Sequence, residues 1–428
     1  MSNQTTHSHR ASLIESPRSR GLLGALLLVA VAIFGIATVH ANPVILHTFN
    51  VTDGLAPIAG LVQGNDGDFY GTTSEGGASG LGTVFKITSS GSLTTLYDFS
   101  GADGASPYAG LAQGSDGDFY GTTLLGGANG LGTVFKITSS GSLTTLHHFS
   151  DSDGAYPYSG LARGSDGNFY GTTNGGGANG FGMVFKITSS GSLTTIHSFS
   201  GSDGRSAEGD LVQGSDGAFY GTTNQGGASD SGTVFKITSG GTFTTLHSFN
   251  GSDGSRPFGE MVQDSAGVFY GTTYFGGLDD AGTVFKITSG GSLTTLHMFS
   301  GGDDGANPYA GLVQGGDGSF YGTAERGGSG NAGTVFTITS GGSLTTLFSF
   351  NGIDGQLPSG ELVQGTDGNF YGTTLQGGAN GFGTVFKFGV MLAPTNVNQC
   401  KNGGWTTFTS PRRFENQGDC IQFVNTGR

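Results

Sequence analysis

The stretch Asp116-Gly117-Asp118-Phe119-Tyr120-Gly121-Thr122-Thr123 decides the fold of this chain, because close copies of it recur at a fixed interval. The interval is 50 residues, except for one step of 51 where the pair Asp303-Asp304 adds a residue. A period of this length indicates stacked or radially arranged supersecondary units, since one unit alone cannot bury its apolar face. The tripeptide Tyr-Gly-Thr marks the seven copies and begins at Tyr70, Tyr120, Tyr170, Tyr220, Tyr270, Tyr321 and Tyr371.

One unit, residues 111–149, predicts four short antiparallel strands. Strands at 111–114 and 119–123 flank an Asp-Gly turn, a strong hairpin signal because its central residues must accept positive φ. A glycine-rich loop leads to a third strand at 132–138, and a Ser-Ser-Gly-Ser turn returns the chain through a fourth at 143–149. The strands are rich in aromatic and β-branched residues, and no stretch has a helical period. Four-stranded units repeated radially form a β-propeller.

The two ends of the repeat region are complementary. Residues 44–50 match the fourth strand of the other units, whereas the seventh unit stops after its third strand at Phe388. An open solenoid would instead need a cap at each end. The sequence therefore predicts an all-β fold, a closed seven-bladed β-propeller over residues 42–391, whose last blade is completed by the N-terminal strand.

The repeated motifs also resemble a known family. The units carry Asp-Gly-x-Phe-Tyr-Gly-Thr-Thr, Gly-Thr-Val-Phe-Lys and Thr-Thr-Leu-His-x-Phe. These motifs resemble the GloVer tandem repeat of exported bacterial proteins, and their rhythm is more distantly similar to NHL-type and kelch-like propeller repeats. The resemblance implies an exported bacterial protein, and it carries no established activity onto any residue.

The first 41 residues predict an export signal. A basic leader with Arg10, Arg18 and Arg20 precedes an apolar run over 21–39, which ends at the small-x-small site Val39-His40-Ala41. Cleavage before Asn42 would release a soluble chain that is secreted, periplasmic or on the surface of a bacterium. An uncleaved run of this length is the alternative, and it would anchor the protein in a membrane.

Charge excludes one class of partner. Removal of residues 1–41 takes away three of 17 basic and one of 31 acidic residues, so 14 basic and 30 acidic residues remain and the net charge is −16. Such a field repels phosphate backbones, and we expect no nucleic-acid partner. We expect a monomer.

The tail differs from the repeats. After a linker at 392–399, residues 400–428 hold both cysteines and the only Trp, and they predict a small separate module. Two cysteines in an exported chain indicate a disulfide, Cys400–Cys420, with two free thiols as the alternative. A metal site is not expected, because no His lies near them. The segment 400–405 with Asn416-Gln417-Gly418 resembles a short motif at the ends of exported bacterial proteins.

Three polar residue types recur at fixed positions, and architecture explains each of them better than chemistry. A fourth-strand position that also accepts Tyr97 and Phe348 indicates packing on the circumference of the ring, and it holds His47, His147, His197, His247 and His297. A third-strand position, where a basic stem can snorkel or pair with a neighbouring Asp, holds Lys86, Lys136, Lys186, Lys236, Lys286 and Lys387.

The third type is the Asp of a loop Asp-Gly pair, which is the best candidate for binding an ion. Calcium needs six to eight oxygen ligands, whereas each loop offers one reliable carboxylate. A turn role is therefore favoured, with calcium as the alternative, at Asp53, Asp103, Asp153, Asp203, Asp253, Asp304 and Asp354.

Catalytic signatures are missing. The chain has no Gly-x-Ser-x-Gly elbow, no His-Glu-x-x-His and no phosphate loop. Paired carboxylates could converge in a propeller channel, as glycosidases require, but glutamate is scarce. We expect no Glu to recur at one position through the ring, given only Glu75, Glu208, Glu260, Glu325, Glu361 and Glu415 after export.

The copies differ mainly in two loops, the fourth-to-first and the second-to-third strand connections, which emerge on the same rim of a propeller. Loops on a rigid scaffold are the usual seat of binding, and exposed aromatic rings suit stacking on sugars. Relaxed constraint on loops is the alternative. The candidate ligand-binding residues are Tyr108, Tyr158, Phe258, Tyr309, Tyr274 and Phe275.

The leading hypothesis is a secreted or cell-surface, non-enzymatic binding propeller whose ligand is a carbohydrate or a protein. The rival is an extracellular propeller hydrolase or lyase that uses carboxylates at the channel mouth. The enzyme needs acidic residues from several blades to meet at that mouth.

If Cys400 and Cys420 form an intramolecular disulfide confined to the tail, reductant should leave the propeller unchanged. Closing a loop of this size contributes about 3 kcal/mol to the tail alone in the chain-entropy model. We therefore expect the far-UV circular dichroism and the main melting transition to be the same with and without reductant. A large loss of stability on reduction would show instead that the tail is integrated into the ring.

Overall fold

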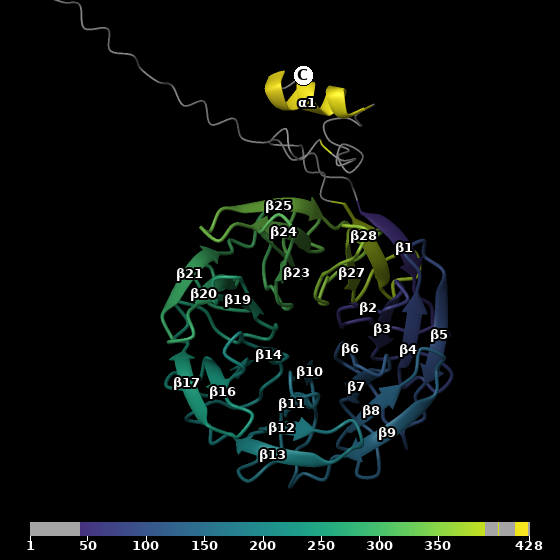
Figure 1. The fold of residues 1–428 in the computed structure, drawn as a ribbon, viewed down its shortest axis with the longest axis vertical. Helices are drawn as coiled ribbons and strands as arrows, with labels where there is room; N and C mark the ends of the chain where they lie inside the picture. Colours follow the sequence, from purple (N-terminus) through teal and green to yellow (C-terminus); the bar gives the residue numbers. More distant parts are fainter. Residues whose placement is uncertain (1–42, 390–400, 402–415, 427–428) are drawn as a thin grey trace, which may run out of the picture. The chain divides into compact units, whose positions relative to one another are not determined.

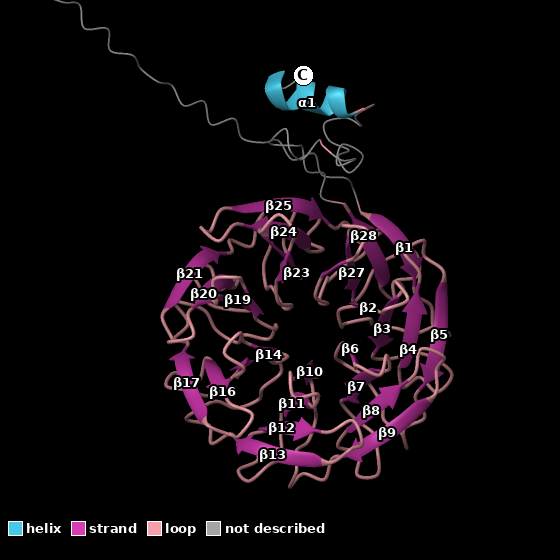
Figure 2. Cartoon of the chain, viewed as in Figure 1, coloured by secondary structure: helices cyan, strands magenta, loops and turns pink. Residues whose placement is uncertain are grey.

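The computed structural model describes residues 43–389, 401 and 416–426. The first of these ranges forms a ring of seven four-stranded antiparallel sheets (Figure 1). This confirms the predicted all-β, seven-bladed propeller. The sheets are arranged around the centre of the ring, and the strands of each sheet lie one behind the other from the inside to the outside (Figure 2).

In the first six blades the strands follow chain order from the inner edge to the outer edge of the sheet. Blade 1 consists of β2 (Val62–Gln63), β3 (Phe69–Thr73), β4 (Thr83–Ile87) and β5 (Leu93–Asp98). Blade 2 consists of β6 (Ala112–Gln113), β7 (Phe119–Thr123), β8 (Thr133–Ile137) and β9 (Leu143–His148). Blade 3 consists of β10 (Ala162–Arg163), β11 (Phe169–Thr173), β12 (Met183–Ile187) and β13 (Leu193–Ser198).

Blade 4 consists of β14 (Val212–Gln213), β15 (Phe219–Thr223), β16 (Thr233–Ile237) and β17 (Phe243–Ser248). Blade 5 consists of β18 (Val262–Gln263), β19 (Phe269–Thr273), β20 (Thr283–Ile287) and β21 (Leu293–Met298). Blade 6 consists of β22 (Val313–Gln314), β23 (Phe320–Ala324), β24 (Thr334–Ile338) and β25 (Leu344–Ser349). Blade 7 consists of β26 (Val363–Gln364), β27 (Phe370–Thr374), β28 (Thr384–Phe388) and β1 (Val44–Thr48).

Blade 7 is built from both ends of the ring, as the sequence predicts. Strand β1 pairs antiparallel with β28, with Val44 opposite Lys387 and Thr48 opposite Thr384. The Phe49 amide donates to the Gly383 carbonyl at 3.1 Å, and the Phe49 side chain is fully buried. The N-terminal strand therefore supplies the outer edge of the last blade.

The glycine repeated in the second strand has a steric reason in each blade. A Cβ at Gly71 would lie 2.6 Å from Cζ of Phe85, so only glycine lets the Phe ring cross the sheet at this point. The Thr73 and Thr83 hydroxyls lie 2.9 Å apart and tie the second strand to the third. The sequence Phe-Tyr-Gly-Thr-Thr thus combines an aromatic pair, a gap and a polar tie in five residues.

The core lies between blades. The Tyr70 ring of blade 1 packs on the Phe119 ring of blade 2 with centroids 4.0 Å apart, and the same contact recurs at every blade junction at 3.9 to 4.3 Å. The last junction closes the ring through Tyr371 and Phe69. Each Tyr also donates from its hydroxyl to an Asp of the preceding turn, such as Asp66 at 2.7 Å from Tyr70.

The recurring charged residues have structural partners. Lys86 pairs with Asp66 at 2.8 Å, and the equivalent lysines of blades 2 to 4 pair in the same way, which confirms the predicted Lys–Asp contact. His47 lies on an outermost strand and contacts Asp53 at 3.1 Å, as do the other four histidines of the series with their loop Asp.

The loop Asp residues therefore face neighbouring side chains and turn amides. Asp53 Oδ1 accepts the Asn50 amide at 2.8 Å, so this carboxylate stabilises the turn. No group of three or more His, Cys, Asp and Glu side chains in the described part of the chain is placed to hold a metal ion.

Several predictions from the chain ends fall outside the described residues: the export signal over 1–41, the linker over 392–399 and Cys400. Cys420 is buried on α1 (Gln417–Thr426), within the predicted C-terminal module. The Cys400–Cys420 disulfide stays a prediction. Within the described ranges, no helix has the length and apolarity needed to cross a bilayer.

Truncation of Phe49 tests the closure of the ring. Phe49 packs edge-to-face on Phe85 at 5.2 Å and is fully buried, so Phe49→Ala should reduce the free energy of unfolding by about 3–5 kcal/mol. The matched control is Val44→Ala in the same strand, where Val44 is 54% exposed and the change should cost about 0.5 kcal/mol or less. Urea titrations followed by circular dichroism measure both. Equal effects of the two substitutions would contradict this account of blade 7.

Candidate functional site in the central channel

The two variable loops of each blade are joined on one rim. In blade 2 the Ala105 amide donates to the Leu125 carbonyl at 2.8 Å, and the Leu125 amide returns the bond at 3.0 Å. The following residue, Ser106, has a φ of 51° although it is not glycine, and its amide donates to the Leu81 carbonyl of blade 1. A left-handed residue of this kind costs about 1–3 kcal/mol and persists only where its surroundings hold it.

This strained residue occurs in all seven blades, at Ala56, Ser106, Tyr156, Ser206, Arg256, Asn307 and Leu357. The residues that follow it are the ones that turn toward the axis of the ring. We call the seven residues that lie two positions after these left-handed residues the rim layer. The rim layer consists of Ile58, Tyr108, Tyr158, Glu208, Phe258, Tyr309 and Ser359.

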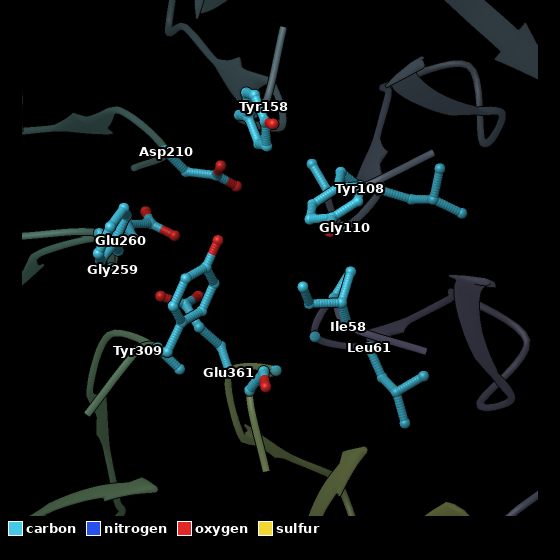
Figure 3. Close-up of a pocket in the computed structure, with 18 of the residues that line it drawn as sticks. Ile58, Leu61, Tyr108, Gly110, Tyr158, Asp210, Gly259, Glu260, Tyr309 and Glu361 are labelled. Carbon is cyan, nitrogen blue, oxygen red and sulfur yellow. The ribbon is translucent and has the colours of Figure 1, made fainter. Parts of the chain in front are cut away.

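These residues surround a cavity of about 330 Å³ at the centre of the ring (Figure 3). All seven blades contribute to its wall, through the end of the fourth-to-first loop and the start of the first strand. No Lys, Arg or His lies among the described residues that line it. Its volume is at the lower end of the range of small-ligand sites, about 300–1,000 Å³.

Four of the six predicted aromatic residues meet in this cavity. Tyr108 and Tyr158 pack edge-to-face at 5.3 Å, and Phe258 stacks on Tyr309 at 5.0 Å. All four are half-buried.

The other two predicted aromatic residues do not line the cavity. Tyr274 packs behind Phe258, at a centroid distance of 5.5 Å, and donates to Glu325 at 2.9 Å. Phe275 contacts Tyr274 and lies under the Arg256 guanidinium at 5.6 Å. These two rings support the wall of the cavity from behind.

Glu208 is the charged member of the rim layer. Its Oε1 accepts from Asn174 Nδ2 at 2.6 Å and from Asn224 Nδ2 at 2.7 Å. The second-to-third strand loops of blades 3 and 4 therefore hold Glu208 in place. Burial raises the pKa of Glu208 to about 7, although both hydrogen bonds act in the opposite direction. Glu208 is therefore partly protonated near neutral pH.

Three further carboxyl groups line the cavity two residues beyond the rim layer. Asp210, Glu260 and Glu361 occupy one repeat position in blades 4, 5 and 7, and we call them the carboxyl trio. The other four blades have glycine there, at Gly60, Gly110, Gly160 and Gly311. Figure 3 shows the trio extending toward the cavity, across from Ile58 and Leu61.

Glycines in the neighbouring blade make room for two members of the trio. Asp210 Oδ1 accepts the Gly160 amide at 2.6 Å, and Glu361 Oε1 accepts the Gly311 amide at 3.1 Å. A Cβ at Gly160 would lie 2.6 Å from Asp210 Oδ2, and one at Gly311 would lie 2.2 Å from Glu361 Oε1. Any side chain at these glycines would therefore displace the carboxylate.

A second glycine precedes each acid of the trio and changes the path of the loop. A Cβ at Gly360 would lie 2.3 Å from Thr373 Oγ1. The Thr72 hydroxyl donates to the carbonyl of Ala109, the residue directly before Gly110. The Thr172 hydroxyl donates instead to the carbonyl of Ala207, three residues before Asp210. The loop backbone therefore has a different conformation in a blade with an acid at this position than in a blade with a glycine there.

The trio shares protons. Burial raises the pKa of Asp210 to about 6. Burial raises the pKa of Glu361 to about 7, with the Asp210 charge as the next cause. Burial raises the pKa of Glu260 well above its usual range, the charges of its two partners add to the rise, and Glu260 hydrogen-bonds to Glu361. Near neutral pH the cavity therefore holds both a carboxylic acid and carboxylates.

Sequence reasoning missed the trio because it compared glutamates alone. Glu260 and Glu361 share a repeat position, which corrects the expectation about recurring Glu, and the third member is an aspartate. The signal is visible in Glu208-Gly209-Asp210, Phe258-Gly259-Glu260 and Ser359-Gly360-Glu361, where the other units end in Ala-Gly or Ser-Gly. Glu75 and Glu325, which the sequence also offered, do not line the cavity.

Replacing the trio with neutral isosteres tests the shared protons. An acid whose pKa is raised on folding favours the folded state below its unfolded pKa, here 3.8 for Asp and 4.5 for Glu, and loses that contribution as pH rises through about 6 to 7. The triple variant Asp210→Asn/Glu260→Gln/Glu361→Gln should melt like the wild type at low pH and above it at pH 7 and higher.

The difference in melting temperature between the two proteins should therefore grow with pH. Carboxylates with a lowered pKa, such as Asp66, are common to both proteins and cancel. A difference that stays flat across this pH range would contradict the assigned direction of the shifts.

Solved structures resemble the ring at low sequence identity. The extracellular domain of a protein described as a hybrid two-component system from B. thetaiotaomicron aligns with a TM-score of 0.54 and 10% identity, over 85% of this chain and 41% of that one. This chain thus spans about two fifths (41%) of the length of that domain. A gluconolactonase from Xanthomonas campestris aligns with a TM-score of 0.42 and 11% identity, over 82% and 96% of the two chains. At 10% identity, the likeness to the extracellular domain shows the fold alone.

A search of curated proteins finds no match to this chain. The family model described as the Gloeobacter/Verrucomicrobia repeat matches residues 30–215 and 207–399, which include all seven repeated units. Residues 400–428 with their cysteine motif lie beyond both matches. The match confirms the tandem-repeat resemblance, and the chain belongs to the Gloeobacter/Verrucomicrobia repeat family.

Proposed function

We propose that this chain is an exported, non-enzymatic binding propeller that holds a carbohydrate in its central cavity. The observation that carries the proposal is the joining of four aromatic rings and several carboxyl groups in one cavity at the centre of the ring. Aromatic faces stack on the apolar face of a sugar ring, while carboxylates accept hydrogen bonds from its hydroxyl groups.

The two sides of the cavity match the two aspects of a sugar. Blades 1 and 2 contribute Ile58, Leu61 and Leu111 to the wall, whereas blades 4, 5 and 7 contribute the carboxyl trio. A pyranose has apolar C–H faces and a polar edge of hydroxyl groups, so it can satisfy both walls at once. A concave cavity of this size also suits a small ligand or the end of a glycan better than a flat protein surface.

The predicted export signal is consistent with a carbohydrate ligand. The signal predicted over residues 1–41 would place the cavity outside the cytoplasm, where sugars and polysaccharides are available as ligands. That segment lies outside the described residues, so secretion belongs to the proposal.

A second candidate function, an extracellular hydrolase or lyase, is favoured by the trio itself. The enzyme hypothesis requires acidic residues from several blades to meet at the channel, and Asp210, Glu260 and Glu361 meet that requirement. Burial raises the pKa of both Glu260 and Glu361, and a pair of carboxyl groups that shares a proton can supply a general acid and a general base. Incubation of a bound glycan with the protein, followed by mass spectrometry, separates the two functions, because only the enzyme converts the ligand.

Two tyrosines in one loop provide a matched test of carbohydrate binding. Tyr158 lines the cavity, whereas Tyr156, two residues before it, is 39% exposed and does not. After a glycan array has identified a ligand, Tyr158→Ala should weaken its affinity about five- to tenfold, the equivalent of roughly 1–1.4 kcal/mol for one lost stacking ring.

Isothermal titration calorimetry measures both variants, and Tyr156→Ala should bind like the wild type. Equal losses in the two variants would place the ligand on the outer loops. An array with no ligand would contradict the proposed function.

A further inference from the structure

The charge of the cavity is one-sided and uncompensated. Glu208 and the carboxyl trio all come from blades 4, 5 and 7, and no basic side chain lines the wall with them. Arg256 lowers the pKa of Glu208 against the effect of burial, and it packs over Phe275, which does not line the cavity. The cavity therefore has acceptors and negative charge with no internal counterion among the described residues.

Tyrosine hydroxyl groups in the same cavity are also left open. Figure 3 shows the Tyr309 side chain extending from its blade toward the centre of the cavity, and the charges that act on its hydroxyl are those of Glu208 and Glu325. Within the described residues, the hydroxyl groups of Tyr108, Tyr158 and Tyr309 make no hydrogen bond. Burial raises the pKa of Tyr309, and the neighbouring Glu208 charge adds to the rise. A half-buried hydroxyl group that has no protein partner can donate a hydrogen bond to a ligand in the cavity.

A cation fits this arrangement better than a neutral group. Without a ligand, bound protons reduce the repulsion between the carboxylates of the trio. A positive group in place of these protons would stabilise the ionised carboxylates. The aromatic rings add to this preference, because the face of Tyr or Phe attracts a cation. A carbohydrate that carries such a group is an amino sugar in its protonated form.

We propose that the cavity selects amino sugars, with the ammonium group among Asp210, Glu260 and Glu361 and the sugar ring against the rim-layer aromatic residues. This inference rests on the proposed carbohydrate-binding function and specifies its ligand. No covalent step is involved. The ammonium group enters with its charge, and carboxylic-acid protons of the trio leave to the buffer.

Calorimetry with glucosamine and glucose tests the inference on the intact chain. The titrations are run between the pKa of Asp210, about 6, and the pKa of the glucosamine ammonium, in two buffers of different ionisation enthalpy. Glucosamine should bind about tenfold more tightly than glucose, since charged hydrogen bonds are roughly twice as strong as neutral ones. The apparent enthalpy should also depend on the buffer for glucosamine alone, because only the cation displaces protons.

The variant Asp210→Asn/Glu260→Gln/Glu361→Gln should lose both the preference for glucosamine and the proton release while it retains weak glucose binding. Melting curves verify that this variant is folded. The matched control is Glu75→Gln, an exposed acid on a second loop outside the cavity, which should bind like the wild type.

The outcomes separate this inference from the function on which it rests. Equal binding of glucose and glucosamine without proton release would overturn the amino-sugar inference and leave carbohydrate binding intact. Binding of Ca²⁺ or Mg²⁺ alone, with the same proton release and no glucosamine binding, would assign the trio to a metal ion and would also overturn it. Failure of every sugar on the array would overturn the proposed function itself.

Discussion

The stacking of a tyrosine on the next blade's phenylalanine is the interaction on which the ring depends. It recurs at all seven junctions with nearly the same spacing, and the Asp of the preceding turn fixes the hydroxyl of each Tyr. Each sheet has too little core of its own, so most buried apolar area lies between sheets. Seven repetitions of this contact, the last of them between Tyr371 and Phe69, close the circle. The central cavity is the space that remains.

The strands of the seven blades are nearly identical because the ring depends on them. The blades can therefore differ only at positions that do not contribute to closing the ring. The fourth-to-first strand loop meets this condition, since backbone hydrogen bonds and a left-handed residue fix its first part in every blade. The two positions that face the axis are then free to vary. Four blades have glycine at the second of them, and three have an acid preceded by glycine. The chain therefore uses a symmetric scaffold to build an asymmetric cavity, with charge on one side and apolar groups on the other.

The sequence predicts the architecture almost completely, because the repeat shows each strand seven times. The strands, their order and the closure by residues 44–50 all follow from comparing the copies. The site is harder to predict. Tyr274 and Phe275 look equivalent to Tyr108 in the sequence, yet they pack behind the wall, because the direction of a side chain depends on loop pairing that the pattern does not show. The trio was recoverable, but only by aligning Asp with Glu at one position. Its raised pKa values were not, because they arise from burial created by the ring.

The closure of blade 7 has a consequence for the order of folding. Val44 and Lys387 are paired across 343 residues (387 minus 44), whereas the strand pairs within the other six blades are formed between neighbours in the sequence. Pairings over such separations form slowly, since a long loop must close before they contribute any free energy. A chain that emerges from its N-terminus must therefore keep β1 unpaired until β28 is available. During that interval both edges are open to other chains, so the waiting time for the last strand sets the period in which the protein is most prone to aggregate.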